Sequence, residues 1–256
     1  MSEIMTMVGL VYAILMITIS LWLLRSGRMT RLLVITISVA TSAIGFILVS
    51  PLVPVQMQAL VLGQRVSGPN ATISIVIILI LIASSLMFGR AFCGYACPIG
   101  AVQEMAFMAP FKKVKIGGEK VRTVHALSSL VFFLGGLVSF SFLGPFGVKE
   151  FFNLDMISPW YYVFVGVLVI GMFVYRPFCR TVCPFGFFSS LFARRSRVGM
   201  GRKDGCRSCR ACEKICPVEE AKCHQDGSGC FLCQRCSDIC TRSAIGYARR
   251  EGIKDD

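Results

Sequence analysis

Residues 92–100 read FCGYACPIG and residues 178–186 read FCRTVCPFG, so both stretches share the pattern F-C-x3-C-P-x-G. They lie 86 residues apart, and each closes an apolar run. This internal repeat predicts two tandem units with a shared site between them. A proline disfavours helix at the residue before it but fits the first position of a new helix. We therefore expect helices to begin at Pro98 and at Pro184.

Apolar runs dominate the chain around and before this repeat. Hydrophobic residues make up 55% of the 256 residues and charged residues 16%, which is more apolar than an ordinary soluble domain. Five runs are each close to the ~20 residues that a helix needs to cross ~30 Å of hydrocarbon. We therefore expect an all-α polytopic membrane protein with about five transmembrane helices. The runs are Ile4–Leu24, Leu32–Pro54, Thr72–Phe88, Val124–Leu143 and Trp160–Tyr175.

Basic residues are unevenly distributed in this chain of formal net charge +13. If the five runs span a membrane, 25 of the 27 Lys and Arg residues fall on one side of it. Basic loops stay in the cytoplasm, so we expect an outside N-terminus and a cytoplasmic C-terminal segment in the inner membrane of a prokaryote. Orientation and anionic lipid then explain the charge without a nucleic-acid partner. No basic segment precedes the first run, which argues against a cleaved secretory signal.

The C-terminal segment contains two runs of four cysteines with the spacing C-x2-C-x2-C-x3-C. This spacing is typical of proteins with two [4Fe–4S] clusters, in which the fourth cysteine of each run ligates the other cluster. Zinc is the alternative, but a zinc site favours two separated cysteine pairs. Cys223 belongs to neither run and is interpreted as a spare thiol. We assign Cys206, Cys209, Cys212 and Cys240 to one cluster, and Cys230, Cys233, Cys236 and Cys216 to the other.

The domain boundaries follow from these patterns. We expect a membrane domain over residues 1–177, which includes the first C-x3-C-P motif. Residues 178–200 hold the second motif and a connecting helix. Residues 201–256 form a small cytoplasmic ferredoxin-like domain with two [4Fe–4S] clusters.

The two C-x3-C-P motifs supply four more cysteines, Cys93, Cys97, Cys179 and Cys183. Cytoplasmic cysteines favour metal ligation or redox chemistry over structural disulfides. A helix N-terminus at Cys97 and at Cys183 would lower the thiol pKa and favour the thiolate. We therefore favour a third metal or iron–sulfur centre at the motifs. Two redox-active dithiols, or cysteines that pack as small apolar residues at helix ends, remain as alternatives.

Several classes of redox and transport protein are disfavoured. His125 and His224 are the two histidines, so ligands for a transmembrane bis-histidine haem are too few. The sequence lacks C-x-x-C-H, a dinucleotide-binding pattern and a Walker A pattern. A lipid-soluble quinone is then the natural redox partner, and its role here is that of substrate. The polar candidates for a quinone site are Tyr95, Gln103, Glu104 and His125.

Together, the C-x3-C-P copies and the two cysteine runs resemble the NapH type of membrane iron–sulfur protein, a quinol-oxidising subunit. Related architectures are the nitrous-oxide reductase accessory protein and a copper-reducing oxidase assembly factor. The resemblance covers about Leu32 to Arg250 and implies electron transfer between quinol and a partner redox protein. It implies roles for Cys93, Cys97, Pro98, Cys179, Cys183, Pro184 and the eight cysteines of the two runs. Thr241 in place of the second run's proline and an additional first span depart from the family pattern.

Three hypotheses follow. The leading one is a quinol dehydrogenase or electron-transfer subunit of a respiratory chain, part of a hetero-oligomeric complex with an iron–sulfur or cytochrome partner. The second is an assembly or regulatory factor that reduces a metal ion such as copper, although the sequence lacks a Met-rich or His-rich tract that would bind it. The third is a membrane anchor in which the duplicated cysteines are structural.

Overall fold

The computed structural model describes residues 3–48, 53–63, 69–202, 206–207, 209–219 and 229–249. Helices form most of this part of the chain. The longer helices are α1 (Glu3–Arg25), α2 (Arg31–Leu48), α4 (Pro69–Phe88), α6 (Gly118–Leu137) and α8 (Pro159–Phe173). Shorter helical segments between them are α3 (Val53–Val61), η2 (Gly144–Phe146) and α7 (Val148–Phe152).

The two C-x3-C-P motifs fold alike. The first contains the π-helix η1 (Phe92–Ala96) and the helix α5 (Pro98–Phe107), and the second contains α9 (Pro177–Thr181) and α10 (Pro184–Ala193). Cys97 and Cys183 have extended backbone and are the N-caps of α5 and α10. The prediction that helices begin at Pro98 and Pro184 is confirmed, because proline at the first helical position lacks only an N–H that would have no partner there.

The remaining elements belong to the cysteine-rich tail, which is described over residues 206–207, 209–219 and 229–249, and to the strand before it. They are β1 (Val198–Arg202), α11 (Ala211–Ile215), α12 (Arg235–Asp238) and β2 (Ile245–Arg249). The two strands form an antiparallel pair in which Met200 lies opposite Tyr247. The expectation of an all-α chain is therefore wrong at this point.

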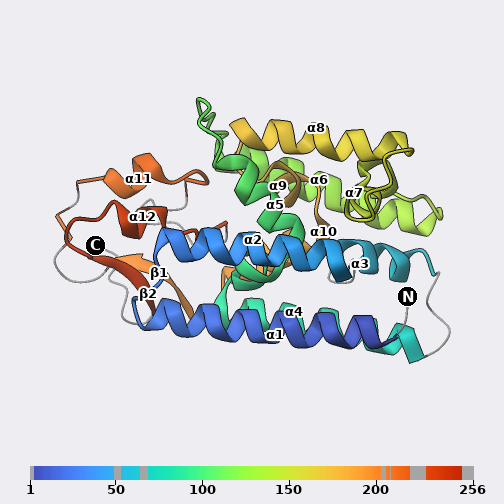
Figure 1. Cartoon of the computed structure of the whole chain (residues 1–256), viewed down its shortest axis with the longest axis horizontal. Helices are drawn as coiled ribbons and strands as arrows, with labels where there is room; N and C mark the ends of the chain where they lie inside the picture. Colours follow the sequence, from blue (N-terminus) through green and yellow to red (C-terminus); the bar gives the residue numbers. More distant parts are fainter. Residues whose placement is uncertain are drawn as a thin grey trace.

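The helices lie side by side along the long axis, and the tail covers one end of them (Figure 1). The tail lies at the opposite end from the N-terminus, next to the end of α1. Strand β2 contacts α1, and β1 contacts α4. Gly89 ends α4 in the left-handed conformation, with φ of +69°, which a residue without a Cβ adopts at no steric cost. The chain thereby turns from α4 into the first motif.

The prediction of about five transmembrane helices is wrong. Within the described residues, only the α1 segment Val8–Arg25 is long and apolar enough to cross a membrane. The apolar parts of α2, α4 and α8 are shorter than the ~20 residues required. The first turns of α6 contain three charged residues, Glu119, Lys120 and Arg122, which shorten its apolar part. The run Val124–Leu143 extends beyond the end of α6 at Leu137, and α8 has 15 residues. The charge argument for orientation then depends on this one helix.

Candidate metal centre

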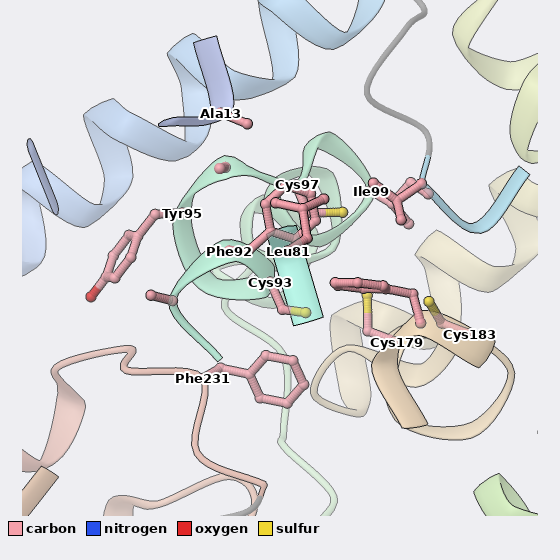
Figure 2. Close-up of a cluster of buried hydrophobic side chains, with 14 of the residues drawn as sticks. Ala13, Leu81, Phe92, Cys93, Tyr95, Cys97, Ile99, Cys179, Cys183 and Phe231 are labelled. Carbon is pink, nitrogen blue, oxygen red and sulfur yellow. The ribbon is translucent and has the colours of Figure 1, made fainter. Parts of the chain in front are cut away.

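Four cysteines from the two motifs lie together in the core. Figure 2 shows Cys93 and Cys97 on one side and Cys179 and Cys183 on the other. All four are buried, and their thiols are close enough for each to affect the pKa of others in the group. The shared site between the halves, which the repeat predicts, is therefore present as a group of four converging sulfurs.

The protonation of these thiols differs from the expectation. Burial raises the pKa of Cys179 to about 11, and burial and the neighbouring cysteines also raise the pKa of Cys97 and Cys183. The backbone N–H of Gly186 does lie 3.3 Å from Cys183 Sγ at the start of α10, but one helix end does not outweigh burial. Four buried thiolates need positive charge among them, which a metal centre supplies.

Each motif also contacts the first cysteine of the other motif. Gln103 Nε2, in α5, lies 3.2 Å from Cys179 Sγ. The position 86 residues later is Ser189, in α10, whose hydroxyl lies 3.8 Å from Cys93 Sγ. The two motifs are thus related by an approximate two-fold arrangement in which polar side chains cross from one copy to the other.

Two buried arginines follow the same crossing pattern. Arg90 and Arg176 each precede the first cysteine of their motif by three residues. Arg176 donates to the carbonyls of Cys93 and Gly94 in the first motif. Arg90 lies against the second motif, where a Cβ on Gly186 would be 3.3 Å from its Nη2. Our sequence reasoning missed both arginines, although the shared R-x-F-C spelling in the two copies was a usable signal.

Glu104 neutralises Arg176 and connects it to the tail. Its carboxylate accepts from Arg176 Nε at 3.1 Å and from the hydroxyl of Tyr175 at 2.7 Å, and it pairs with Arg235 of the tail. Burial alone raises the pKa of Glu104, but Arg176 and Arg235 outweigh burial and hold this pKa below its ordinary value. The group is therefore a buried carboxylate shared by two guanidinium groups.

The second cysteine run of the tail packs directly on the first motif. The hydroxyl of Tyr95 donates to the carbonyl of Leu232. The carbonyl of Phe231 lies so close to Gly94 that a Cβ there would be 2.6 Å from it. The guanidinium carbon of Arg90 lies 3.9 Å from the centre of the Phe231 ring. Phe231 and Leu232, which lie between Cys230 and Cys233, therefore contact the first motif at the residues between Cys93 and Cys97.

The tail cysteines differ in their surroundings. Cys216 lies close enough to Cys230 and Cys236 to affect the pKa of both, and burial, the larger cause, raises the pKa of Cys236 to about 12. Cys206 and Cys209 are exposed. The exchange of fourth ligands between the clusters stays a prediction. Cys223 and His224 lie outside the described residues.

The predicted quinone-site residues lie in the core around the cysteines. Tyr95, Gln103 and Glu104 are buried and hydrogen-bonded within the protein. His125 is also buried, with Nε2 2.8 Å from the carbonyl of Cys183. Burial lowers the pKa of His125 to about 4, so its imidazole is neutral. The structure brings these four side chains to the metal centre, where they position cysteines and the tail.

The donor set fits an iron–sulfur cluster. Arg90 is 3% exposed, and its Nε and Nη2 have no hydrogen-bond partner among the described residues. Unpartnered buried N–H donors are costly, and thiolates or sulfides of a cluster would accept from them. In the described part of the chain, no three Cys, His, Asp or Glu side chains gather tightly enough for a single metal ion. A cubane of four irons takes its ligands at separate corners, and the two motifs supply four buried cysteines.

A known sequence family matches the same region. A model described as a 4Fe-4S binding domain matches residues 70–117 and 158–203. These two segments contain Cys93, Cys97, Cys179 and Cys183, whereas the cysteine runs of the tail lie outside them.

Relatives extend the likeness beyond the two segments. The chain is 29% identical to an uncharacterized protein of Methanocaldococcus jannaschii, over 73% of this chain and 74% of that protein. It is 27% identical to the methylamine utilization ferredoxin-type protein MauN of Methylorubrum extorquens, over 63% and 58%. It is 31% identical to the regulatory protein NosR of Stutzerimonas stutzeri, over 60% of this chain and 24% of that protein. No solved structure matches the chain.

These likenesses confirm the iron–sulfur part of the resemblance, while the NapH type stays a prediction. The two matched segments meet in the structure as one group of buried cysteines. Two segments of the chain therefore match a 4Fe-4S binding domain, and the chain is similar to ferredoxin-type proteins over more than half of its length, which supports an iron–sulfur electron-transfer role.

Proposed function

We propose that the protein takes electrons from quinol and passes them between the motif cysteines and the tail to a partner redox protein. The observation that supports this most is the direct packing of Phe231 and Leu232 on the first motif. It brings the tail run that contains Cys230 and Cys233 next to the four motif cysteines. Two redox centres in contact through a few buried residues form a short path for electrons.

The residues divide into three ligand sets. Cys93, Cys97, Cys179 and Cys183 would hold one [4Fe–4S] cluster, and the two tail sets assigned from the cysteine spacing would hold two more. Such clusters supply one-electron transfer, so a quinol that becomes quinone releases two protons and gives up its two electrons one at a time. The chain's own residues keep water out of the core and fix the tail against the motifs.

A cavity near the end of α1 is the best-supported place for quinol. Its volume is about 390 Å³, and Met87 and Phe88 give it an apolar wall. Arg25, Arg197 and Tyr247 add polar groups at the same cavity. An apolar wall with a few polar groups suits an amphipathic ring. Arg25 also ends the candidate span Val8–Arg25, so a lipid-soluble substrate would reach the cavity from the membrane.

Membrane association and orientation are part of the proposal. Arg25 ends the candidate span, and Arg28 and Arg31 follow it. By the positive-inside rule, the N-terminus lies outside and the cysteines lie on the cytoplasmic side. A redox partner would then bind there.

Cluster reduction by quinol tests the proposal. The protein is purified anaerobically with oxidised clusters, mixed with a menaquinol analogue and followed by low-temperature electron paramagnetic resonance. We expect rapid reduction in the wild type and in Cys223→Ser, the matched control outside both cysteine runs. The double variant Cys97→Ser/Cys183→Ser should lose one cluster signal and be reduced far more slowly.

Two outcomes would contradict the proposal. Clusters that dithionite reduces but menaquinol does not would exclude quinol as the donor and leave metal reduction as the better hypothesis. Undiminished reduction in the double variant would show that the motif cysteines are structural and would favour the anchor hypothesis.

A further inference from the structure

The two copies of the motif are not equivalent at their arginines. Arg176 has a carboxylate partner in Glu104, 3.1 Å from its Nη2. The position that corresponds to Glu104 in the second motif is Ser190, 86 residues later. Ser190 has no charge, and its hydroxyl donates to the carbonyl of Phe187 at 2.7 Å. No described carboxylate forms an ion pair with Arg90. The repeat therefore contains one neutralised and one unneutralised buried arginine.

The unneutralised arginine is directed at the cysteines. Arg90 is buried, and its Nε and Nη2 have no hydrogen-bond partner among the described residues. Its Nη2 would be 3.3 Å from a Cβ on Gly186, the glycine that follows Cys183 by three residues. Its guanidinium also covers the ring of Phe231, beside the tail cysteines Cys230 and Cys233. Arg90 thus lies between the motif cysteines and the second cysteine run of the tail.

We propose that Arg90 is the positioning residue that sets the reduction potential of the cluster at the motif cysteines. The inference rests on the proposed ligand set. A fixed positive charge in a buried, low-dielectric site stabilises the reduced, more negative cluster, and N–H donors to cluster sulfurs act in the same direction. Arg90 makes this cluster a better electron acceptor than its four thiolates alone would allow.

The charge of Arg90 has a strong effect on the reduction potential because no described carboxylate pairs with it. A carboxylate at position 190 would cancel the charge, as Glu104 does for Arg176. The two arginines therefore have different roles. Arg90 acts on the cluster, whereas Arg176 shares Glu104 with Arg235 and so helps to attach the tail.

A potentiometric titration monitored by electron paramagnetic resonance tests the inference. The signal of the motif cluster is first identified as the one that is lost in Cys97→Ser/Cys183→Ser. We expect Arg90→Gln to shift the midpoint potential of this signal to a more negative value, with the tail signals shifted less. Arg90→Lys should restore most of the potential, because it keeps the charge. Lys149→Gln, which removes an exposed charge in α7, should leave the potential unchanged.

A second variant keeps the test decisive if Arg90→Gln does not fold. Ser190→Glu leaves Arg90 in place but offers it a carboxylate, and it should also lower the midpoint potential of the motif cluster. An unchanged midpoint in Ser190→Glu, or in an Arg90→Gln protein with full iron content, would overturn the role of Arg90. A wild-type protein without any signal that depends on Cys97 and Cys183 would instead overturn the proposed ligand set.

Discussion

Gly94 lies at the point where the first motif meets the tail, and its missing side chain lets two backbones touch. The carbonyl of Phe231 occupies the space that a Cβ on Gly94 would need. On either side of this contact, buried charged groups are arranged around Glu104. Single residues at this interface therefore control how closely the tail approaches the motif cysteines.

Replacement of Gly94 by alanine should destabilise the protein. The new Cβ would lie 2.6 Å from a backbone carbonyl that no side-chain rotation can move. Overpacking of this kind costs about 1–3 kcal/mol, or roughly 2–4 °C of melting temperature per kcal/mol in a chain of this size. The measurement is thermal unfolding followed by circular dichroism. Gly166→Ala is the control, because a Cβ there meets nothing within 4 Å; equal melting temperatures for the two variants would contradict the expectation.

Replacement of Glu104 by glutamine should have a larger effect. It leaves the guanidinium groups of Arg176 and Arg235 buried without a counter-charge, and removal of one partner of a buried ion pair costs about 3–5 kcal/mol. Denaturant unfolding measures the loss of unfolding free energy. The matched control is Glu119→Gln on the exposed start of α6, where a change within about 0.5 kcal/mol is expected. A similarly small loss for Glu104→Gln would show that the group around Glu104 is not a stabilising one.

At the scale of elements, the two copies of the motif make equivalent hydrogen bonds as well as sharing a sequence pattern. Helix α5 provides Gln103 to Cys179 of the second motif, and helix α10 provides Ser189 to Cys93 of the first. The helices before the motifs also make equivalent bonds, although each of these stays within its own copy. Thr41 of α2 donates to the carbonyl of Tyr95, and Ser128 of α6 donates to the carbonyl of Thr181, the position 86 residues later. Each half therefore completes the site of the other.

A side-chain hydrogen bond of Tyr247 connects the strand pair β1–β2 to α4. Its hydroxyl donates to the carbonyl of Phe88 at the end of α4, at 3.2 Å. Tyr247→Phe removes this bond at a net cost of about 1 kcal/mol. We expect faster amide hydrogen exchange in β1 and β2 and unchanged exchange in α8, which serves as the internal control. Equal exchange of the strands in both proteins would mean that apolar packing alone holds the pair.

At the scale of the whole molecule, the tail and the helices differ in what stabilises them. The helices bury a continuous apolar core that includes Phe92, Phe132 and Phe178. The described tail has only two helices of four and five residues and one strand of five. Segments this short do not persist without tertiary support. The tail therefore depends on its packing against the first motif and on the clusters that we propose at its cysteines.

Removal of iron should unfold the tail and leave most of the helical core intact. Metal binding to a small cysteine-rich segment is coupled to its folding, whereas the helices have their own core. After treatment with a chelator and an oxidant, we expect faster hydrogen exchange over residues 209–219 and 229–249 and little change in α1 and α2. Helical circular dichroism should fall only slightly. Exchange that rises equally in all parts of the molecule would show that the core also requires the clusters.

Local patterns were sufficient for the features that depend on a few neighbouring residues. The helix starts at Pro98 and Pro184 follow from the restricted φ of proline, and the cysteine spacing led to an iron–sulfur protein before any comparison. Length and composition were not sufficient for the membrane spans, because the residues at which α6 and α8 begin and end depend on packing and turns. The burial that raises the thiol pKa of Cys97 and Cys183 could not be predicted for a similar reason, since burial is a property of the fold.

The sequence by itself therefore determined the duplicated motif, the cysteine sets and the class of cofactor, because each is written in residue type and spacing. Only the tertiary structure decided that side chains cross between the copies, that Glu104 joins Arg176 to Arg235, and that Arg90 lies against the second motif without a carboxylate partner among the described residues. These contacts join residues 72 to 131 positions apart. Burial and charge pairing at such separations depend on how the whole chain packs, and the spacing of neighbouring residues does not predict that packing.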